Sequence, residues 1–131
     1  MAIRLLIVDD ETMVRMGLVA YFEDEGFEVR WADSAAEAMA ILAAEEFNAA
    51  IVDLRLRDSD GESFILLAHH LRPRTQFLIH TGCLSYRLSP ALRALGLTDA
   101  SIVLKPARLQ QIAERIRDHG SADSLPTGEG Q

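Results

Sequence analysis

The sequence predicts an α/β fold, a doubly wound five-stranded parallel sheet with helices on both faces. Short apolar segments alternate along the chain with longer segments whose apolar residues recur at helical spacing. Parallel neighbours in a sheet need right-handed helical connections, and this alternation supplies them. One domain is expected, because 131 residues is an ordinary domain length and the chain has neither an internal repeat nor a second apolar block.

Five segments are predicted to be strands. Four of them are nearly continuous apolar runs, as in strands that are buried on both faces. Residues 28–32 instead alternate polar and apolar side chains, which is typical of an edge strand with one wetter face. The strand order 2-1-3-4-5 of a doubly wound sheet places this segment at an edge. In chain order the segments are 3–8, 28–32, 49–53, 76–80 and 101–104.

Four longer segments carry apolar residues at helical spacing and are predicted to be helices. Gly26 is a stop signal for the first, and Pro73 lies where the third should end. Ser34 and Glu37 have the spacing of a capping box at the start of the second. The apolar positions are Val14, Leu18, Tyr21 and Phe22; Ala35, Ala38, Met39 and Leu42; Phe64, Leu67, Ala68 and Leu71; and Leu109, Ile112, Ala113 and Ile116.

The remaining helix, fourth in chain order, is predicted to be short. Ser89 is a good N-cap, Pro90 suits the first helical position, and Gly96 marks the end. Because proline disfavours helical geometry at the residue before it, residues 83–88 are expected to be irregular.

The end of the chain differs from the rest. From His119 onward it holds polar residues, Gly, Ser and Pro without periodicity. Residues 1–118 are therefore predicted to form the domain, and residues 119–131 a disordered tail or the start of a linker.

Composition excludes several classes of protein. The 13 basic and 20 acidic residues give a net charge of -7, whereas a nucleic-acid surface needs clustered Lys and Arg. A single cysteine excludes an internal disulfide, and no apolar run approaches the roughly 18 residues of a membrane span. We expect no signal peptide, because the chain enters the first predicted strand at residue 3 without a longer apolar segment before it. We expect a cytoplasmic protein with no direct contact to nucleic acid or membrane.

Polar residues follow the predicted strands. Asp9 and Asp10 follow the first strand and Asp53 ends the third, and the predicted order places these strands side by side at the switch point where such sheets bind ligands. Taken alone, Asp53 could equally cap the next turn. Converging carboxylates repel, and Mg²⁺ with its preference for oxygen ligands would resolve this. Thr81 and Lys105 follow the fourth and fifth strands, which completes the groups that phosphoryl transfer requires.

With these residues at the ends of its predicted strands, the chain resembles the receiver domain of bacterial response regulators over residues 3–118. The resemblance implies the flavodoxin-like (CheY-like) form of the predicted fold. Each matching motif is weak alone, and their order along the chain makes the match specific. The motifs are Asp9-Asp10, Asp53, Gly61 eight residues later, Thr81 and Lys105-Pro106.

The resemblance implies a signalling role rather than enzymatic turnover. Asp53 would accept a phosphoryl group from a sensor histidine kinase or a histidine phosphotransfer protein, and the product would switch binding to a downstream protein effector. Thr81 and Lys105 would contact the phosphoryl oxygens, and the Lys105-Pro106 bond would be cis. A homodimer is compatible with the family. Only intrinsic phosphotransfer and autodephosphorylation are expected.

The resemblance also implies a Mg²⁺ site. Asp10, Asp53 and the backbone carbonyl of Arg55 would be its direct ligands. Asp9 would act through the outer shell.

Three positions depart from the family pattern. Ile102 stands where the family usually has Tyr or Phe, so an aromatic side chain that follows the threonine is missing. Arg57 replaces a proline, which predicts a less rigid loop. The segment between Thr81 and Lys105 is about two residues longer than usual. Without the aromatic, phosphorylation is predicted to act by ordering or shifting residues 82–96.

Two alternative functions stay open. The first is a receiver-like module that binds its partner without phosphorylation, which Ile102 favours. The second is a Mg²⁺-dependent phosphohydrolase using Asp53, which is disfavoured because Asp53-Leu54-Arg55 lacks the second carboxylate of the Asp-x-Asp motif. A dinucleotide-binding protein is weaker still, since no G-x-G-x-x-G follows the first strand. Of the neighbouring residues, His80 is expected to be packed and Cys83 to lie near the core.

Overall fold

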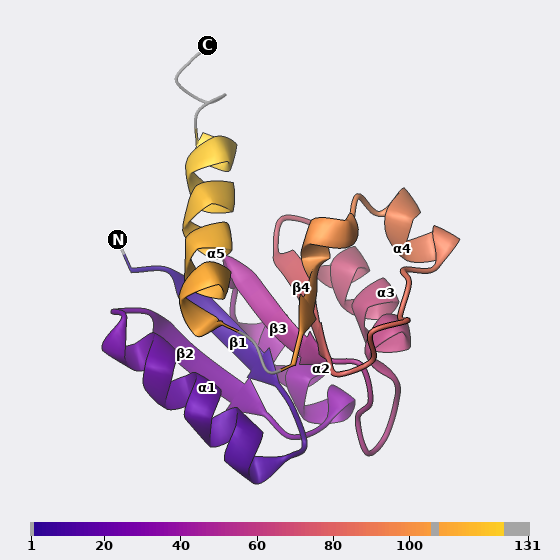
Figure 1. Cartoon of the computed structure of the whole chain (residues 1–131), viewed down its shortest axis with the longest axis horizontal. Helices are drawn as coiled ribbons and strands as arrows, with labels where there is room; N and C mark the ends of the chain where they lie inside the picture. The colour runs from indigo at the N-terminus through magenta and orange to yellow at the C-terminus, as the bar shows by residue number, and fades with distance from the viewer. Residues whose placement is uncertain (1, 106–107, 125–131) are drawn as a thin grey trace.

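The computed structural model describes residues 2–105 and 108–124, which form a five-stranded parallel sheet in the order β2-β1-β3-β4-β5 (Figure 1). The predicted fold is confirmed. The strands are β1 Arg4–Val8, β2 Glu28–Ala32, β3 Ala49–Asp53, β4 Gln76–Thr81 and β5 Ile102–Leu104. The helices are α1 Thr12–Asp24, α2 Ala35–Ala44, α3 Gly61–Leu71, α4 Pro90–Ala94 and α5 Leu109–Ser124, with a 3₁₀ turn, η1, at Asp99–Ser101.

Two apolar layers, one on each face of the sheet, hold the helices in place. All of β3 is buried, and its side chains alternate between the layers: Ala49 and Ile51 pack toward α1 and α5, and Ala50 and Val52 pack toward α2, α3 and α4. This alternation explains the continuous apolar runs in the sequence, because both faces of a central strand need apolar side chains. At the sheet edge, β2 pairs with β1 alone and has the predicted wetter pattern.

The start of α2 is capped from two directions. Ser34 Oγ accepts the N–H of Glu37 at 3.1 Å, as the capping box predicts, but Glu37 Oε1 accepts the N–H of Asp33 and not that of Ser34. Asp58, in the loop after β3, accepts the N–H groups of Ala35 and Ala36 at 2.8 and 3.0 Å. These backbone donors lower the pKa of Asp58. The β3–α3 loop is therefore tied to α2 by its own carboxylate.

The short α4 is confirmed. Ser89 Oγ accepts the N–H of Leu92, Pro90 occupies the first helical position, and Gly96 adopts a φ of +102° just past the end. Leu92 is fully buried and anchors the helix. Residues 83–88 are irregular, as predicted.

The last helix is longer than predicted. α5 continues to Ser124, so residues 119–124, which the sequence assigns to the tail, are helical. Ile112 and Ile116 are buried and anchor the earlier turns of this helix. Figure 1 shows the end of α5 projecting beyond the sheet. Residues 125–131 lie outside the described residues, and the domain boundary stays a prediction.

Candidate functional site

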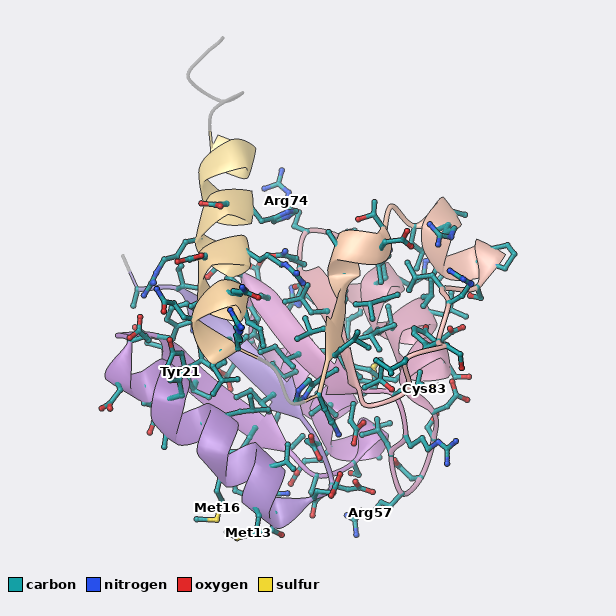
Figure 2. The ribbon with its side chains drawn as sticks, viewed as in Figure 1. Met13, Met16, Tyr21, Arg57, Arg74 and Cys83 are labelled. Carbon is teal, nitrogen blue, oxygen red and sulfur yellow. The ribbon has the colours of Figure 1, made fainter. Side chains whose placement is uncertain are left out.

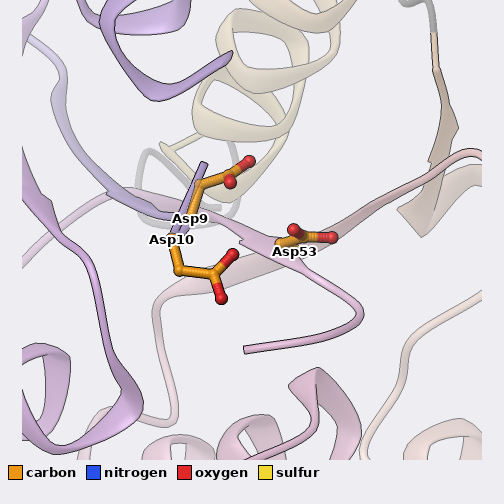
Figure 3. Close-up of side chains that lie close together, drawn as sticks. All are labelled: Asp9, Asp10 and Asp53. Atoms are coloured by element: carbon orange, nitrogen blue, oxygen red, sulfur yellow. The ribbon is translucent and has the colours of Figure 1, made fainter. Parts of the chain in front are cut away.

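Three carboxylates converge at the carboxyl ends of β1 and β3 (Figure 3). Asp9 and Asp10 directly follow β1, and Asp53 is the last residue of β3, which pairs with β1. Oxygen atoms of the three side chains lie within 4.8 Å of one another. The predicted convergence is confirmed. Three acidic groups this close repel one another unless a cation or a proton compensates their charge.

Asp9 is the buried member of this cluster, with 1% of its surface exposed. Its Oδ1 accepts the N–H of Glu11 at 2.9 Å, whereas its Oδ2 is buried without a hydrogen-bond partner among the described residues. Burial raises the pKa of Asp9 to about 6, and Asp53 adds to this rise while the Glu11 N–H opposes it. An orphaned carboxylate oxygen within an all-oxygen cluster fits a hard cation with bound water.

The raised pKa of Asp9 predicts a pH dependence of stability. The fold favours the neutral carboxyl, so its contribution is full below the ordinary value near 3.8 and is lost as pH rises through about 6. Without metal, Asp9→Asn should raise the free energy of unfolding near pH 7.5 by about 1–3 kcal/mol. Urea unfolding at several pH values would measure this. Asp24→Asn, on the exposed end of α1, is the control. If the free energy of unfolding changes with pH equally in Asp9→Asn and in wild type, the prediction is contradicted.

Asp53 faces a cavity of about 390 Å³. Burial raises its pKa, and the Lys105 ammonium, with Nζ 3.4 Å from Asp53 Oδ1, opposes the rise. Lys105 Nζ also lies 3.6 Å from Glu11 Oε1. The cavity is lined by Asp10, Glu11, Asp53, Leu54, Arg55, Leu56, Thr81, Gly82, Cys83 and Lys105. Asp10, Thr81 and Lys105 therefore lie where the sequence predicted, whereas Asp9 is absent from the lining and sits behind it.

Thr81 ends β4 and is buried. Its Oγ1 accepts the N–H of Cys83 at 3.1 Å, which leaves its own hydroxyl proton available to an acceptor in the cavity. The backbone N–H of Lys105 donates to the carbonyl of Thr81, so the two predicted site residues are held together by the β4–β5 pairing. Arg55 lines the same cavity, and the role of its carbonyl stays a prediction. Pro106, and with it the predicted cis bond, lies outside the described residues.

Glu11 is a site residue that the sequence reasoning missed. Its ion pair with Lys105 places a fourth carboxylate at the mouth of the cavity. The sequence does mark Glu11 as a candidate, because Glu11 follows Asp9 and Asp10 directly. The sequence does not reveal the path of the chain after β1, and this path turns Glu11 toward Lys105.

The sequence predicts packed positions for two neighbours of Thr81, His80 and Cys83. His80 is buried, so the expectation of a packed histidine is confirmed. Burial lowers the pKa of His80 to about 4. The expectation for Cys83 is wrong, since this residue is exposed. The strand ends at Thr81, and the chain leaves the sheet before Cys83 can be buried.

Gly61 allows the loop after β3 to fold back on the site. Its N–H donates to the carbonyl of Leu54 at 2.6 Å, and a Cβ built on Gly61 would lie 2.4 Å from the carbonyl oxygen of Asp53. Real Cβ atoms do not approach backbone oxygen so closely. Only glycine fits here, which explains the spacing of Asp53 and Gly61 in the sequence.

Gly61→Ala should therefore destabilise the protein and displace the Asp53 backbone. We expect a loss of about 1–3 kcal/mol in the free energy of unfolding, because the clash is with backbone that cannot move freely. Thermal or urea unfolding would measure it. Gly82→Ala is the matched control, since its Cβ would come no closer than 3.9 Å to Lys105. If both variants lose the same stability, the close approach is not the cause.

Comparison with known proteins agrees with this site. The family model described as the response regulator receiver domain matches residues 5–117. The photosynthetic apparatus regulatory protein RegA of Cereibacter sphaeroides is 32% identical over 122 residues, which are 93% of this chain. The chain spans 64% of the length of that relative.

Solved structures share the fold. A CheY-like receiver domain protein from Methanospirillum hungatei has a TM-score of 0.75 and 28% identity, covering 93% of this chain and 99% of that one. A response regulator from Burkholderia pseudomallei, solved with a phosphorylated aspartic acid, a calcium ion and citrate, has a TM-score of 0.71 and 26% identity, covering 97% and 75% of the two chains. This chain therefore belongs to the response regulator receiver domain family of two-component signalling proteins.

Proposed function

We propose that this domain is a phosphoryl-accepting switch, in which Asp53 takes a phosphoryl group from a phosphohistidine of a sensor kinase or a histidine phosphotransfer protein. The observation that carries the proposal is the arrangement around Asp53. The Asp10 and Asp53 carboxylates, the Thr81 hydroxyl and the Lys105 ammonium line one small cavity. The Asp9 carboxylate lies outside the lining, with an oxygen within 4.8 Å of oxygens of Asp10 and Asp53. The Burkholderia relative, whose structure holds a phosphorylated aspartic acid, supports the same role for Asp53.

The geometry suggests how this chain's residues serve the transfer. An Asp53 carboxylate oxygen attacks phosphorus, the P–N bond to the donor histidine breaks, and the leaving imidazole nitrogen takes a proton. Because burial raises the pKa of Asp53, the nearby Lys105 ammonium helps to keep the nucleophile ionised. Thr81 and Lys105 would then donate to the phosphoryl oxygens, where negative charge develops.

Mg²⁺ would be held by Asp10, Asp53 and the Arg55 carbonyl. When bound, it supplies positive charge that offsets the carboxylates and the incoming phosphoryl oxygens. Asp9 would orient the metal's water and Asp10 from behind, since it lies outside the cavity lining and has one orphaned oxygen.

The phosphorylated domain would switch binding to a downstream protein in the cytoplasm, either within a longer protein or as a separate partner. Nucleic-acid contact is not proposed, because the chain carries a net charge of -7. Among the described residues, the structure contains no helix that is long and apolar enough to span a membrane. A homodimer is a further state in which the switch could act.

Intact mass spectrometry after incubation with acetyl phosphate tests the proposal. The wild-type protein should gain one phosphoryl group with Mg²⁺ and much less with EDTA. Absence of any gain would favour the alternative of a phosphorylation-independent module, which Ile102 supports by replacing the usual aromatic. Steady turnover of a phosphate ester such as p-nitrophenyl phosphate would instead indicate a phosphohydrolase.

A further inference from the structure

Tyr86 lies in the segment between β4 and α4 and makes two kinds of contact. Its ring packs against the apolar layer under α2, α3 and α4, and its hydroxyl donates to Glu62 Oε2 in the first turn of α3. Burial, and then the hydrogen bond to Glu62, raise the pKa of Tyr86. The phenol therefore stays protonated near neutral pH and remains a donor.

This bond connects the segments that follow the two central site residues. On one side, Thr81 Oγ1 accepts the N–H of Cys83 at 3.1 Å, and the carbonyl of Cys83 accepts the N–H of Tyr86 at 3.2 Å. On the other side, Glu62 follows Gly61, which abuts the carbonyl of Asp53. Two hydrogen bonds thus link the Thr81 hydroxyl to the backbone of Tyr86, and the Tyr86 hydroxyl extends this connection to Glu62 at the start of α3.

Ile102 cannot make such a connection. It packs against the same apolar layer as Tyr86 but has no polar group. The sequence contains two tyrosines, and the other one, Tyr21, packs from α1 on the opposite face of the sheet (Figure 2). Tyr86 is therefore the tyrosine placed to respond to Thr81.

We infer that the Tyr86–Glu62 hydrogen bond holds the β4–α4 segment in its unphosphorylated position, and that phosphorylation of Asp53 releases it. This inference rests on the proposed function of Asp53. When Thr81 donates to the new phosphoryl oxygens, its Oγ1 moves toward Asp53 and draws the Cys83 amide with it. The turn from Cys83 to Tyr86 follows, and the phenol leaves Glu62. The surface formed by this segment and α4 then differs between the two states.

The location of the change can be measured with tyrosine labelled at ¹³Cζ, an atom whose chemical shift senses the hydroxyl's hydrogen bond. The spectrum should hold two signals, which Tyr21→Phe assigns. Mg²⁺ with beryllofluoride should shift the Tyr86 signal and leave that of Tyr21 in place. In parallel, acetyl phosphate and intact mass establish whether Asp53 is modified.

The energetic arm uses Tyr86→Phe, which keeps the ring and removes the donor. If the bond restrains the inactive state, this variant should reach half-saturation at about tenfold lower beryllofluoride, the factor expected for a hydrogen bond to a charged acceptor. Glu62→Gln keeps an acceptor and should lie between Tyr86→Phe and wild type. Tyr21→Phe, which removes the hydroxyl of another partly buried tyrosine, should match wild type. A purely structural role would lower stability without tightening beryllofluoride binding.

The outcomes separate this inference from the function on which it rests. If Asp53 takes up phosphate but the Tyr86 signal stays in place and Tyr86→Phe binds beryllofluoride as wild type does, the release mechanism is wrong and the phosphoacceptor stands. If wild type takes up neither phosphate nor beryllofluoride, the proposed function fails and the inference fails with it. A shifted Tyr86 signal together with tighter binding by Tyr86→Phe supports both.

Discussion

Asp53→Asn should abolish the phosphoryl gain that acetyl phosphate and Mg²⁺ produce in the wild-type protein. The amide of asparagine has no nucleophilic carboxylate oxygen, and Asp53 is the carboxylate that meets Lys105 at 3.4 Å inside the cavity. The variant should stay folded, because it removes a buried charge whose burial raises the pKa of Asp53. Loss of modification would then report chemistry and not unfolding. Intact mass measures the phosphoryl gain, and circular dichroism of the same sample measures whether the variant is folded.

The matched control for this experiment is Asp60→Asn. Asp60 accepts the N–H of Ser63 at 2.8 Å as the N-cap of α3, and asparagine is an equally good cap. This variant changes an aspartate near the site without touching the cavity lining. It should gain a phosphoryl group as wild type does. The same mass gain in Asp53→Asn under these conditions would show that another residue is the acceptor.

The convergence of the carboxylates could be predicted from the sequence because it depends on the sheet alone. Central parallel strands are buried on both faces, so β1 and β3 appear as continuous apolar runs with clear ends. The order of a doubly wound sheet then places those ends side by side. Asp10 and Asp53 needed no further information to be brought together.

The contacts of the loops could not be predicted in this way. Tyr86 with Glu62, Glu11 with Lys105, and Asp58 with the start of α2 each join segments that have left the sheet. Loop conformation follows turn geometry and packing, which leave no period in the sequence.

The 3₁₀ turn η1 and the end of α5 were also difficult to predict, because neither leaves a periodic pattern in the sequence. η1 is too short to show a periodic pattern, and its capping box of Thr98 and Ser101 becomes evident only in the structure. The extent of α5 has a related cause, because the residues from His119 onward carry no apolar repeat in the sequence that could mark a helix. By contrast, Ser89 and Pro90 fixed the start of α4 because capping chemistry is local.

Mg²⁺ binding should depend more on Asp10 than on Asp9, although Asp9 is the more buried of the two. Asp10 lines the cavity, whereas Asp9 lies behind it with one oxygen held by the N–H of Glu11. Loss of an outer-shell carboxylate costs roughly 10- to 100-fold in metal affinity, and loss of a direct ligand costs more. We expect Asp9→Asn to weaken binding by about tenfold and Asp10→Asn by about 100-fold or more.

Two reporters can follow a Mg²⁺ titration of these variants. The amide signal of Gly61 reports from beside Asp53. The fluorescence of Trp31, the only tryptophan, reports from β2, where Trp31 pairs with Ile7 of β1. Trp31 is connected to the site because the Arg15 guanidinium lies 4.1 Å from its ring and donates to the carbonyl of Asp9. Because that link passes through Asp9, Asp9→Asn could alter the fluorescence directly. The order of Mg²⁺ affinities of the two variants must therefore be the same by fluorescence and by the Gly61 amide signal. Equal losses in the two variants, or a larger loss in Asp9→Asn, would instead make Asp9 a direct ligand.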